Sequence, residues 1–137
     1  MSLSTGPTRS LLHGVPVLIK DNVASQEFGA TAGFLGLIGA MPSRENVAVT
    51  WLREAGAVIL GATNLSEWAN FRSRDWGDNG WSPRGGQTYG TYHKKMDPCG
   101  SSSGSGVGLD LGMCMLAIGS EVCRGGSRPW SGDTNML

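Results

Sequence analysis

Three short and continuously hydrophobic runs divide the sequence. They cover residues 15–19 (VPVLI), 57–60 (AVIL) and 115–119 (MLAIG), and each run ends at or is followed by a glycine or a charged residue. Runs of this length without polar alternation are typical of strands that are covered on both faces. We therefore predict buried strands near these three positions.

The segment between the first two runs has a helical spacing instead. Within residues 43–55 (SRENVAVTWLREA) the apolar residues recur three and four positions apart and share one face, namely Val47, Ala48, Trp51, Leu52 and Ala55. Ser43 is a suitable N-cap residue, and Gly56 is a suitable stop after the last turn. A second helix is expected at residues 107–115. Strand, helix and strand in this order predict an α/β fold.

The end of the chain differs from the rest. Residues 122–137 (VCRGGSRPWSGDTNML) contain few hydrophobic residues and follow neither the helical nor the strand period. We therefore expect residues 1–121 to contain the folded part of the chain. Residues 122–137 are expected to be a divergent and disordered tail.

The charge balance excludes several classes of partner. The formal net charge is zero, from 11 basic and 11 acidic residues, and the basic residues form no stripe. Nucleic acid and anionic membranes are therefore not expected as partners. No hydrophobic run approaches the roughly 18 to 20 residues of a membrane-spanning helix. The N-terminal segment does not resemble a secretory signal, so the cytoplasm is the default expectation. Oligomeric state is left open.

Cysteine and histidine are too few and too scattered for a metal centre. The three cysteines have no C-x-x-C spacing, and the two histidines, His13 and His93, are far apart in the sequence. Neither a structural zinc site nor a disulfide framework is predicted.

A serine and glycine cluster at residues 99–108 (CGSSSGSGVG) has several interpretations. It is compatible with a flexible loop. It does not match a phosphate-binding loop, because Val107 stands where a lysine is required. Gly100 to Gly104 match the G-x-S-x-G pattern of a serine hydrolase, but that mechanism needs a later histidine, and none follows His93.

Lys20 ends the first hydrophobic run (GVPVLIKDN). A lysine at the end of a strand is commonly a solvated surface charge. It becomes a candidate base only where burial lowers its pKa, so that the neutral amine can accept a proton.

Taken together, three stretches resemble the amidase signature family in the same order. They are GVPVLIKDN at 14–22, AGAVILGATNLSEWANF at 55–71 and GGQTYGTYHKKMDPCGSSSGSGV at 85–107, and the resemblance extends over about residues 11–121. It implies a mixed sheet flanked by helices, of which residues 1–121 would form a partial amidase domain. It also implies hydrolysis of small-molecule amides by a Ser–cis-Ser–Lys arrangement that uses no cofactor or metal.

The resemblance assigns roles to two of the residues above. Lys20 corresponds to the catalytic lysine. Ser101 corresponds to the serine that bridges the lysine and the nucleophile, and in the family its peptide bond is cis. Non-proline cis bonds are expensive and persist only where the surrounding structure enforces them.

The position of the nucleophile is ambiguous. By its distance from Ser101, the family's nucleophilic serine falls at position 125, which is glycine here. Ser127 follows Gly125 and Gly126 and mimics the family's G-G-S ending two positions late. Ser127 is therefore a candidate nucleophile, with the backbone N–H groups of Gly125 and Gly126 as candidate oxyanion donors. Alternatively, the sequence departs from the family after Glu121, and the Gly-Gly-Ser is a coincidence.

Two functions follow from these alternatives. The first is an amidase-type hydrolase that cleaves a carboxamide C–N bond, with a site that is incomplete in this chain. The second is a catalytically inactive amidase fragment with at most a binding role.

Overall fold

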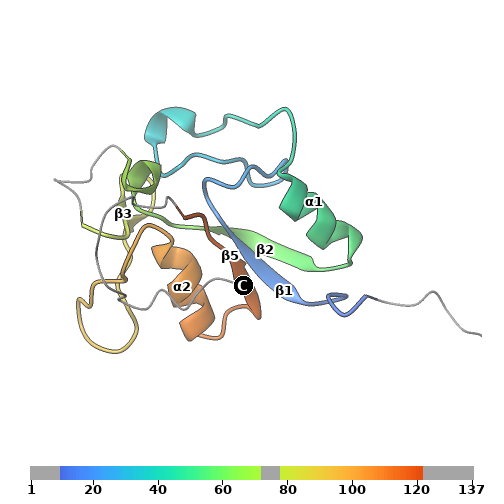
Figure 1. Ribbon diagram of the computed structural model, residues 1–137. Helices are drawn as coiled ribbons and strands as arrows, with labels where there is room; N and C mark the ends of the chain where they lie inside the picture. Colours follow the sequence, from blue (N-terminus) through green and yellow to red (C-terminus); the bar gives the residue numbers. More distant parts are fainter. Residues whose placement is uncertain (1–9, 72–77, 122–137) are drawn as a thin grey trace, which may run out of the picture.

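A three-stranded sheet with a helix on each side forms the centre of the molecule (Figure 1). The computed structural model describes residues 10–71 and 78–121. The tail predicted at 122–137 lies outside the described residues. No helix within the described ranges is long and apolar enough to cross a membrane.

The central sheet is parallel throughout. Its order is β2–β1–β5, with β1 at Pro16–Lys20, β2 at Val58–Thr63 and β5 at Leu116–Ile118. The α/β fold and all three predicted strands are confirmed. β2 continues past Gly61, where the run was expected to stop, because a register shift between β1 and β2 accommodates one extra residue there.

The helix α1 spans Val47–Glu54 and begins later than the sequence predicted. Asn46, not Ser43, is its N-cap, and the Asn46 side chain accepts a hydrogen bond from the Ala48 N–H at 2.9 Å. The Asn46 N–H is itself bonded to Ala24 O at 2.8 Å, which fixes the helix start to the loop after β1. The expected stop at Gly56 is confirmed by its left-handed φ of 84°.

The helix α2 spans Ser103–Asp110 and not 107–115. It starts inside the Ser/Gly cluster because Gly104 packs directly on the end of β2, where a Cβ would lie 2.5 Å from Asn64 O. It ends because Gly112 is left-handed, with a φ of 67°, and cannot continue the helix. The spacing of apolar residues did not predict this helix correctly, because α2 packs against the sheet through glycines.

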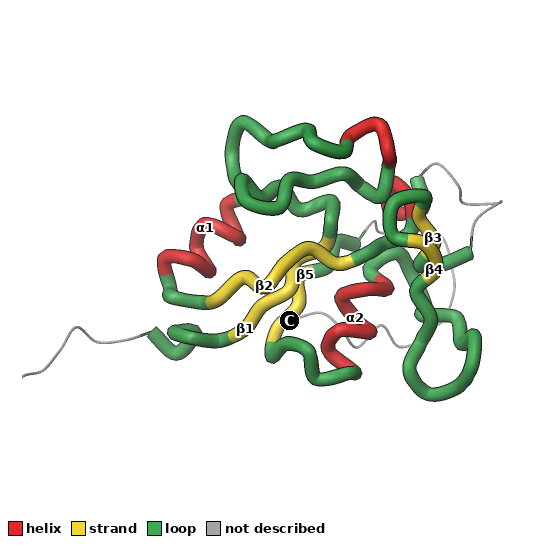
Figure 2. Tube along the Cα trace, turned by 180° about the vertical axis from the view of Figure 1, so that it is seen from behind, coloured by secondary structure: helices red, strands yellow, loops and turns green. Residues whose placement is uncertain are grey.

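The two helices cover opposite faces of the sheet (Figures 1 and 2). Val17 and Ile19 of β1 are fully buried on the α1 side, in a core cluster with Val49 of α1. Leu18 and Lys20 point the other way, since side chains alternate along a strand. Leu18 contacts the α2 backbone at Gly108, where a Cβ would lie 2.7 Å from Leu18 Cδ1. Lys20 therefore extends toward the start of α2.

Short elements surround the carboxyl ends of the strands, where ligands bind in open α/β sheets. They are the 3-10 helices η1 (Leu35–Leu37) and η2 (Glu67–Asn70) and the hairpin of β3 (Trp81–Ser82) and β4 (Gly86–Gln87). Hydrogen bonds from Ser66 N to Ser101 O and from Gly80 N to Ser66 Oγ join η2, the hairpin and the start of α2.

Candidate active site

Lys20 is completely buried at the end of β1. Its Nζ lies 2.8 Å from Ser101 Oγ, 2.8 Å from Ser102 Oγ and 3.2 Å from the carbonyl oxygen of Ser120. The structure thus brings the two predicted residues Lys20 and Ser101 into direct contact. Strand β1 supplies the lysine, the start of α2 supplies the serines, and the residues after β5 supply the carbonyl.

Burial lowers the pKa of Lys20 from 10.5 to about 8. Within residues 10–71 and 78–121, no carboxylate forms an ion pair with Lys20 to oppose this shift. At pH 7 roughly a tenth of such amines are neutral, compared with well under a thousandth for a solvated lysine. The neutral amine has a lone pair and can accept a proton.

Ser101 and Ser102 touch the same amine but have different bonding. The Ser102 hydroxyl donates to Ser120 O at 3.2 Å and accepts from the Ser120 N–H at 3.3 Å. The Ser101 hydroxyl has Lys20 as its hydrogen-bond partner among the described residues. When Lys20 is neutral, Ser101 is therefore the serine whose proton can be donated to the amine, while Ser102 fastens the end of β5 to α2.

The backbone around Ser101 differs from the prediction. All peptide bonds of the described residues are trans, so the cis bond expected at Ser101 is not present. Ser101 instead follows two consecutive left-handed residues, Cys99 with φ 55° and Gly100 with φ 77°. These two residues turn the chain into the start of α2. The turn places the Ser101 hydroxyl next to Lys20 Nζ, although all the peptide bonds are trans.

Asn22 extends the site beyond the lysine. Its Nδ2 donates to Ser120 Oγ at 2.8 Å, so Lys20 and Asn22 both contact Ser120. Sequence reasoning did not assign roles to Asn22, Ser102 or Ser120. Asn22 and Ser102 stand within the motifs that define the resemblance, and Ser120 stands near the end of the region that it covers. Their contacts depend on how β5 lies beside β1.

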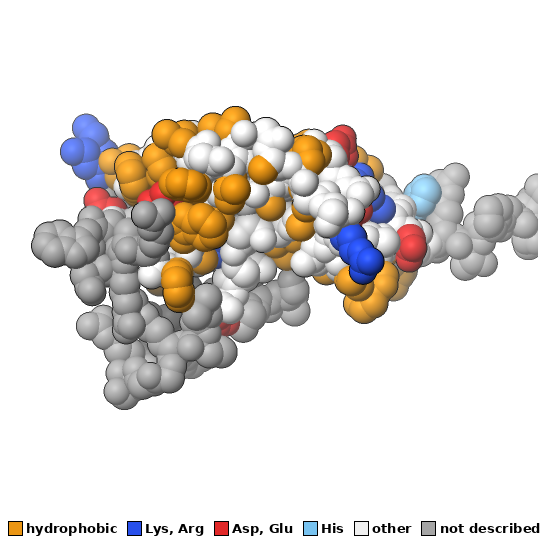
Figure 3. Space-filling view, turned by 90° about the horizontal axis from the view of Figure 1, so that it is seen from above, with side chains coloured by type: hydrophobic (Ala, Val, Ile, Leu, Met, Phe, Trp, Pro, Cys, Tyr) orange, Lys and Arg blue, Asp and Glu red, His pale blue; other side chains and the backbone are white. Residues whose placement is uncertain are grey.

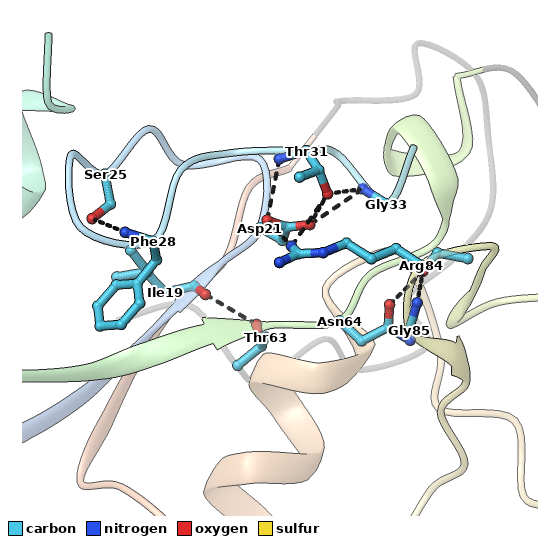
Figure 4. Close-up of polar contacts among 11 residues, drawn as sticks. Ile19, Asp21, Ser25, Phe28, Thr31, Gly33, Thr63, Asn64, Arg84 and Gly85 are labelled. Atoms are coloured by element: carbon cyan, nitrogen blue, oxygen red, sulfur yellow. Dashed lines mark hydrogen bonds and ion pairs between the residues drawn. The ribbon is translucent and has the colours of Figure 1, made fainter. Parts of the chain in front are cut away.

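A second buried charge follows Lys20 directly (Figure 4). Asp21 forms an ion pair with Arg84 at 2.8 Å. Its carboxylate also accepts hydrogen bonds from the hydroxyl and N–H of Thr31 and from the N–H of Gly33. This network joins the loop after β1 to the hairpin β3–β4.

The remaining predicted site residues, Gly125, Gly126 and Ser127, lie outside the described residues. Ser120, which precedes them in the sequence, is bonded at the site. Gly119 allows the chain before Ser120 to lie close to Ser102, since a Cβ there would lie 2.8 Å from Ser102 Oγ. No group of three metal-ligating side chains occurs in the part of the chain that the structure describes.

The chain belongs to the amidase family. The family's sequence profile matches residues 2–127. A protein of Arthroderma benhamiae that is named as an amidase is 47% identical over 118 residues, which are 85% of this chain and 20% of that protein. A protein of Schizosaccharomyces pombe that is also named as an amidase is 42% identical over 120 residues, which are 87% of this chain and 20% of that protein.

Solved structures agree with this assignment. The native peptide amidase from Stenotrophomonas maltophilia superposes with a TM-score of 0.75 at 50% identity, over 80% of this chain and 22% of that chain. An amidase family protein from Bacillus anthracis gives a TM-score of 0.78 at 37% identity, over 82% of this chain and 23% of that chain. The chain therefore spans about a fifth of the length of the relatives it matches.

Proposed function

We propose that this chain carries the lysine base and the bridging serine of an amide hydrolase. The observation that supports this best is the contact between a fully buried lysine, with a pKa lowered to about 8, and the Ser101 hydroxyl. The membership in the amidase family supports the same reaction.

The proposed reaction proceeds in balanced proton transfers. Neutral Lys20 accepts the Ser101 proton while Ser101 accepts the proton of a nucleophilic serine. The nucleophile attacks the amide carbonyl carbon, and backbone N–H groups stabilise the oxyanion that forms. As the C–N bond breaks, the Lys20 ammonium returns its proton through Ser101 to the leaving amine. Water then hydrolyses the acyl ester by the same relay.

Ser127 is the proposed nucleophile, with Gly125 and Gly126 as oxyanion donors. This part of the proposal rests on the family's G-G-S ending alone. The glycine at position 125 favours the second candidate function, an inactive fragment that binds ligands without turnover.

Hydrolysis of a small aryl amide by the full 137-residue chain tests the proposal. Amine release should fall to background in Lys20→Arg, because arginine keeps the charge but stays protonated and cannot act as a base. A loss of about 10² to 10⁴ in rate is expected for a general base. Lys94→Arg, at an exposed lysine, is the matched control and should keep full activity.

The same assay separates the two candidate functions. Activity that is lost in Lys20→Arg and in Ser127→Ala supports the complete relay. Activity lost in Lys20→Arg but kept in Ser127→Ala rejects Ser127 as the nucleophile. Release of amine no faster than from the Lys20→Ala chain rejects hydrolysis by this chain and leaves the binding role.

A further inference from the structure

Ser101 differs from the other serine at Lys20 in what its hydroxyl would lose by reacting. Ser101 is partly exposed, and Lys20 Nζ, at 2.8 Å, is the one hydrogen-bond partner of its hydroxyl among the described residues. The Ser102 hydroxyl also contacts Lys20, but it is bonded to both backbone groups of Ser120. Ser101 is therefore the serine that can attack a ligand without releasing another segment of the fold.

The base that a nucleophilic serine needs is already in contact with Ser101. Burial lowers the pKa of Lys20 to about 8, and no carboxylate of the described residues forms an ion pair with it. The sequence has no histidine after His93, which excludes the usual serine-hydrolase triad. A neutral lysine can replace histidine, because Ser–Lys pairs perform the same activation on other folds.

The backbone after Ser101 offers donors for a developing negative charge. Helix α2 begins at Ser103, and the N–H groups of Ser102 and Ser103 have no hydrogen-bond partner in the described part of the chain. The N–H group that follows a nucleophilic serine is a common oxyanion donor, and the start of a helix favours negative charge. The Ser66 N–H donates to Ser101 O at 3.1 Å and holds this backbone in place.

These contacts define a function that the relay does not use. We propose that Ser101 is itself a nucleophile, activated directly by Lys20, and that neutral esters with a good leaving group acylate it. This goes beyond the proposed function, in which Ser101 only transfers protons between Lys20 and another serine. It does not involve Ser127 and is compatible with the glycine at position 125.

The acylation step balances with the groups present. The Ser101 O–H bond breaks, its proton forms an N–H bond with neutral Lys20, and the Oγ electron pair forms a bond with the ester carbonyl carbon. The C–O bond to the leaving group then breaks, and its electron pair departs on an aryl oxide anion. Lys20 must release its proton to solvent before it can assist the water that hydrolyses the acyl ester, so deacylation is the slower step.

The same geometry selects the class of substrate. An amine leaving group needs a proton, but once Ser101 is acylated it no longer connects the buried Lys20 to that group. An aryl oxide leaves without a proton. The face of the molecule that carries η1, at the carboxyl ends of the strands, presents mainly hydrophobic side chains, with charged ones toward its ends (Figure 3). A neutral aryl ester therefore fits this site better than an amide or an ion.

Reaction of the full chain with p-nitrophenyl acetate tests the proposal. Nitrophenolate should appear in a burst of about one equivalent per chain, followed by slower turnover. Peptide mass spectrometry should find the acetyl group on Ser101, and hydroxylamine should remove it, since hydroxylamine cleaves esters but not the acetamides that form at exposed lysines. The burst rate should rise with pH, with a midpoint near the Lys20 pKa of about 8.

Variants make the test specific. Lys20→Arg and Ser101→Ala should each lower the burst rate by about 10²-fold or more, because the first removes the base and the second the nucleophile. Ser101→Cys keeps a nucleophile at the same place and should be acetylated on its thiol. Ser43→Ala removes an exposed hydroxyl outside the site, is the matched control and should keep the full burst rate. Circular dichroism of each variant reports whether it is folded.

The outcomes separate this inference from the proposed function. An acetyl ester on Ser127 that is lost in Ser101→Ala supports the relay and overturns the inference. An ester on Ser102, no ester at all, or a burst that is unchanged in Lys20→Arg also overturns it, whatever the amide assay gives. Acetylation of Ser101 in a chain that releases no amine from an aryl amide supports the inference and rejects the proposed function.

Discussion

Lys20 and Asp21 are consecutive, oppositely charged and both buried, yet the fold surrounds them differently. Asp21 is 3% exposed and is paired with a guanidinium and with backbone donors. Lys20 is 0% exposed and contacts two hydroxyls and one carbonyl. The partners of Asp21 are a cation and hydrogen-bond donors, whereas those of Lys20 are neutral. The direction of the Lys20 pKa shift follows, because neutral contacts do not compensate the loss of hydration.

The difference has a functional consequence. Asp21 is held by a countercharge and by hydrogen-bond donors and connects parts of the fold, whereas Lys20 has no countercharge and its lowered pKa allows proton transfer near neutral pH. Arg84 gives Asp21 a countercharge of its own, so the carboxylate is engaged in the network and not with Lys20. The chain thereby combines a structural charge and a reactive amine at adjacent positions.

The largest expected effect on stability comes from replacing Asp21. Asp21→Leu leaves the N–H group of Thr31 unpaired, removes one of the two acceptors of the Gly33 N–H and removes the ion-pair partner of Arg84. We expect the free energy of unfolding to fall by about 3 kcal/mol, the lower end for a broken buried pair, because Arg84 reaches solvent. Urea denaturation monitored by circular dichroism measures this change.

Lys20→Met is the matched substitution at the neighbouring position. It replaces a largely desolvated amine with an apolar chain of similar length, so at pH 7 the free energy of unfolding should change by less than about 1 kcal/mol. Equal destabilisation by Asp21→Leu and Lys20→Met would contradict the distinction between the two charges.

The pH dependence of stability tests the lowered pKa of Lys20. Its pKa is about 8 in the folded chain and 10.5 without burial, so between these values the unfolded chain binds the additional proton. Stability from this group therefore rises as the pH increases from about 8 to 10.5 and is lost as it decreases again. At about 1.4 kcal/mol per pKa unit, the difference between pKa values of 10.5 and about 8 corresponds to about 3.5 kcal/mol in total.

The Lys20→Met chain isolates this contribution from other groups that titrate at high pH. The unfolding free energy of the unmodified chain minus that of Lys20→Met should increase across this interval. A constant difference would show that the lysine keeps an ordinary pKa in the folded chain.

A smaller effect is expected on the pKa of Lys20 when the countercharge of Asp21 is removed. Arg84→Leu removes the countercharge of Asp21, whose negative charge then acts on Lys20 and should raise the lysine pKa above about 8. A ¹³C titration of the lysine side chains measures it. Arg53→Leu, which breaks exposed ion pairs on α1, is the control and should leave the Lys20 pKa unchanged.

The smallest effect compares the two serines. Ser102→Ala removes contacts to Lys20 and to both backbone groups of Ser120, and should reduce the unfolding free energy by about 1 kcal/mol. Ser101→Ala should be nearly neutral for stability. If the chain hydrolyses amides, Ser101→Ala should nevertheless lose more activity. The opposite ranking in both assays would exchange the roles of the two serines.

The sequence predicted the elements whose packing surfaces are hydrophobic. The three strands and the approximate position of α1 follow from runs of valine, leucine and isoleucine. The start of α1 was wrong because Ser43 and Asn46 are both good N-caps, and only the tertiary bond from Asn46 to Ala24 selects between them. Helix α2 was misplaced because its contact with β2 is made by Gly104, which contributes nothing to a hydrophobic pattern.

The candidate site was predicted in part. Lys20 and Ser101 were found through a resemblance, since 81 positions separate them and no local spacing relates them. The roles of Asn22, Ser102 and Ser120 could not be predicted, because they depend on the parallel register that places β5 beside β1. The left-handed backbone at Ala32 and Ala69 could not be predicted either, because alanine rarely adopts this conformation.

The hydrogen bond from the Ser120 N–H to Ser102 Oγ also determines how the site opens. This amide proton is held by a side chain from another segment, so it exchanges with solvent only when the end of β5 separates from the start of α2. Gly119, which has no Cβ to obstruct Ser102, lets the two segments approach closely enough for this bond. The hydrogen-exchange rate of a single amide, that of Ser120, therefore reports the free energy of opening of the assembled Lys20 site.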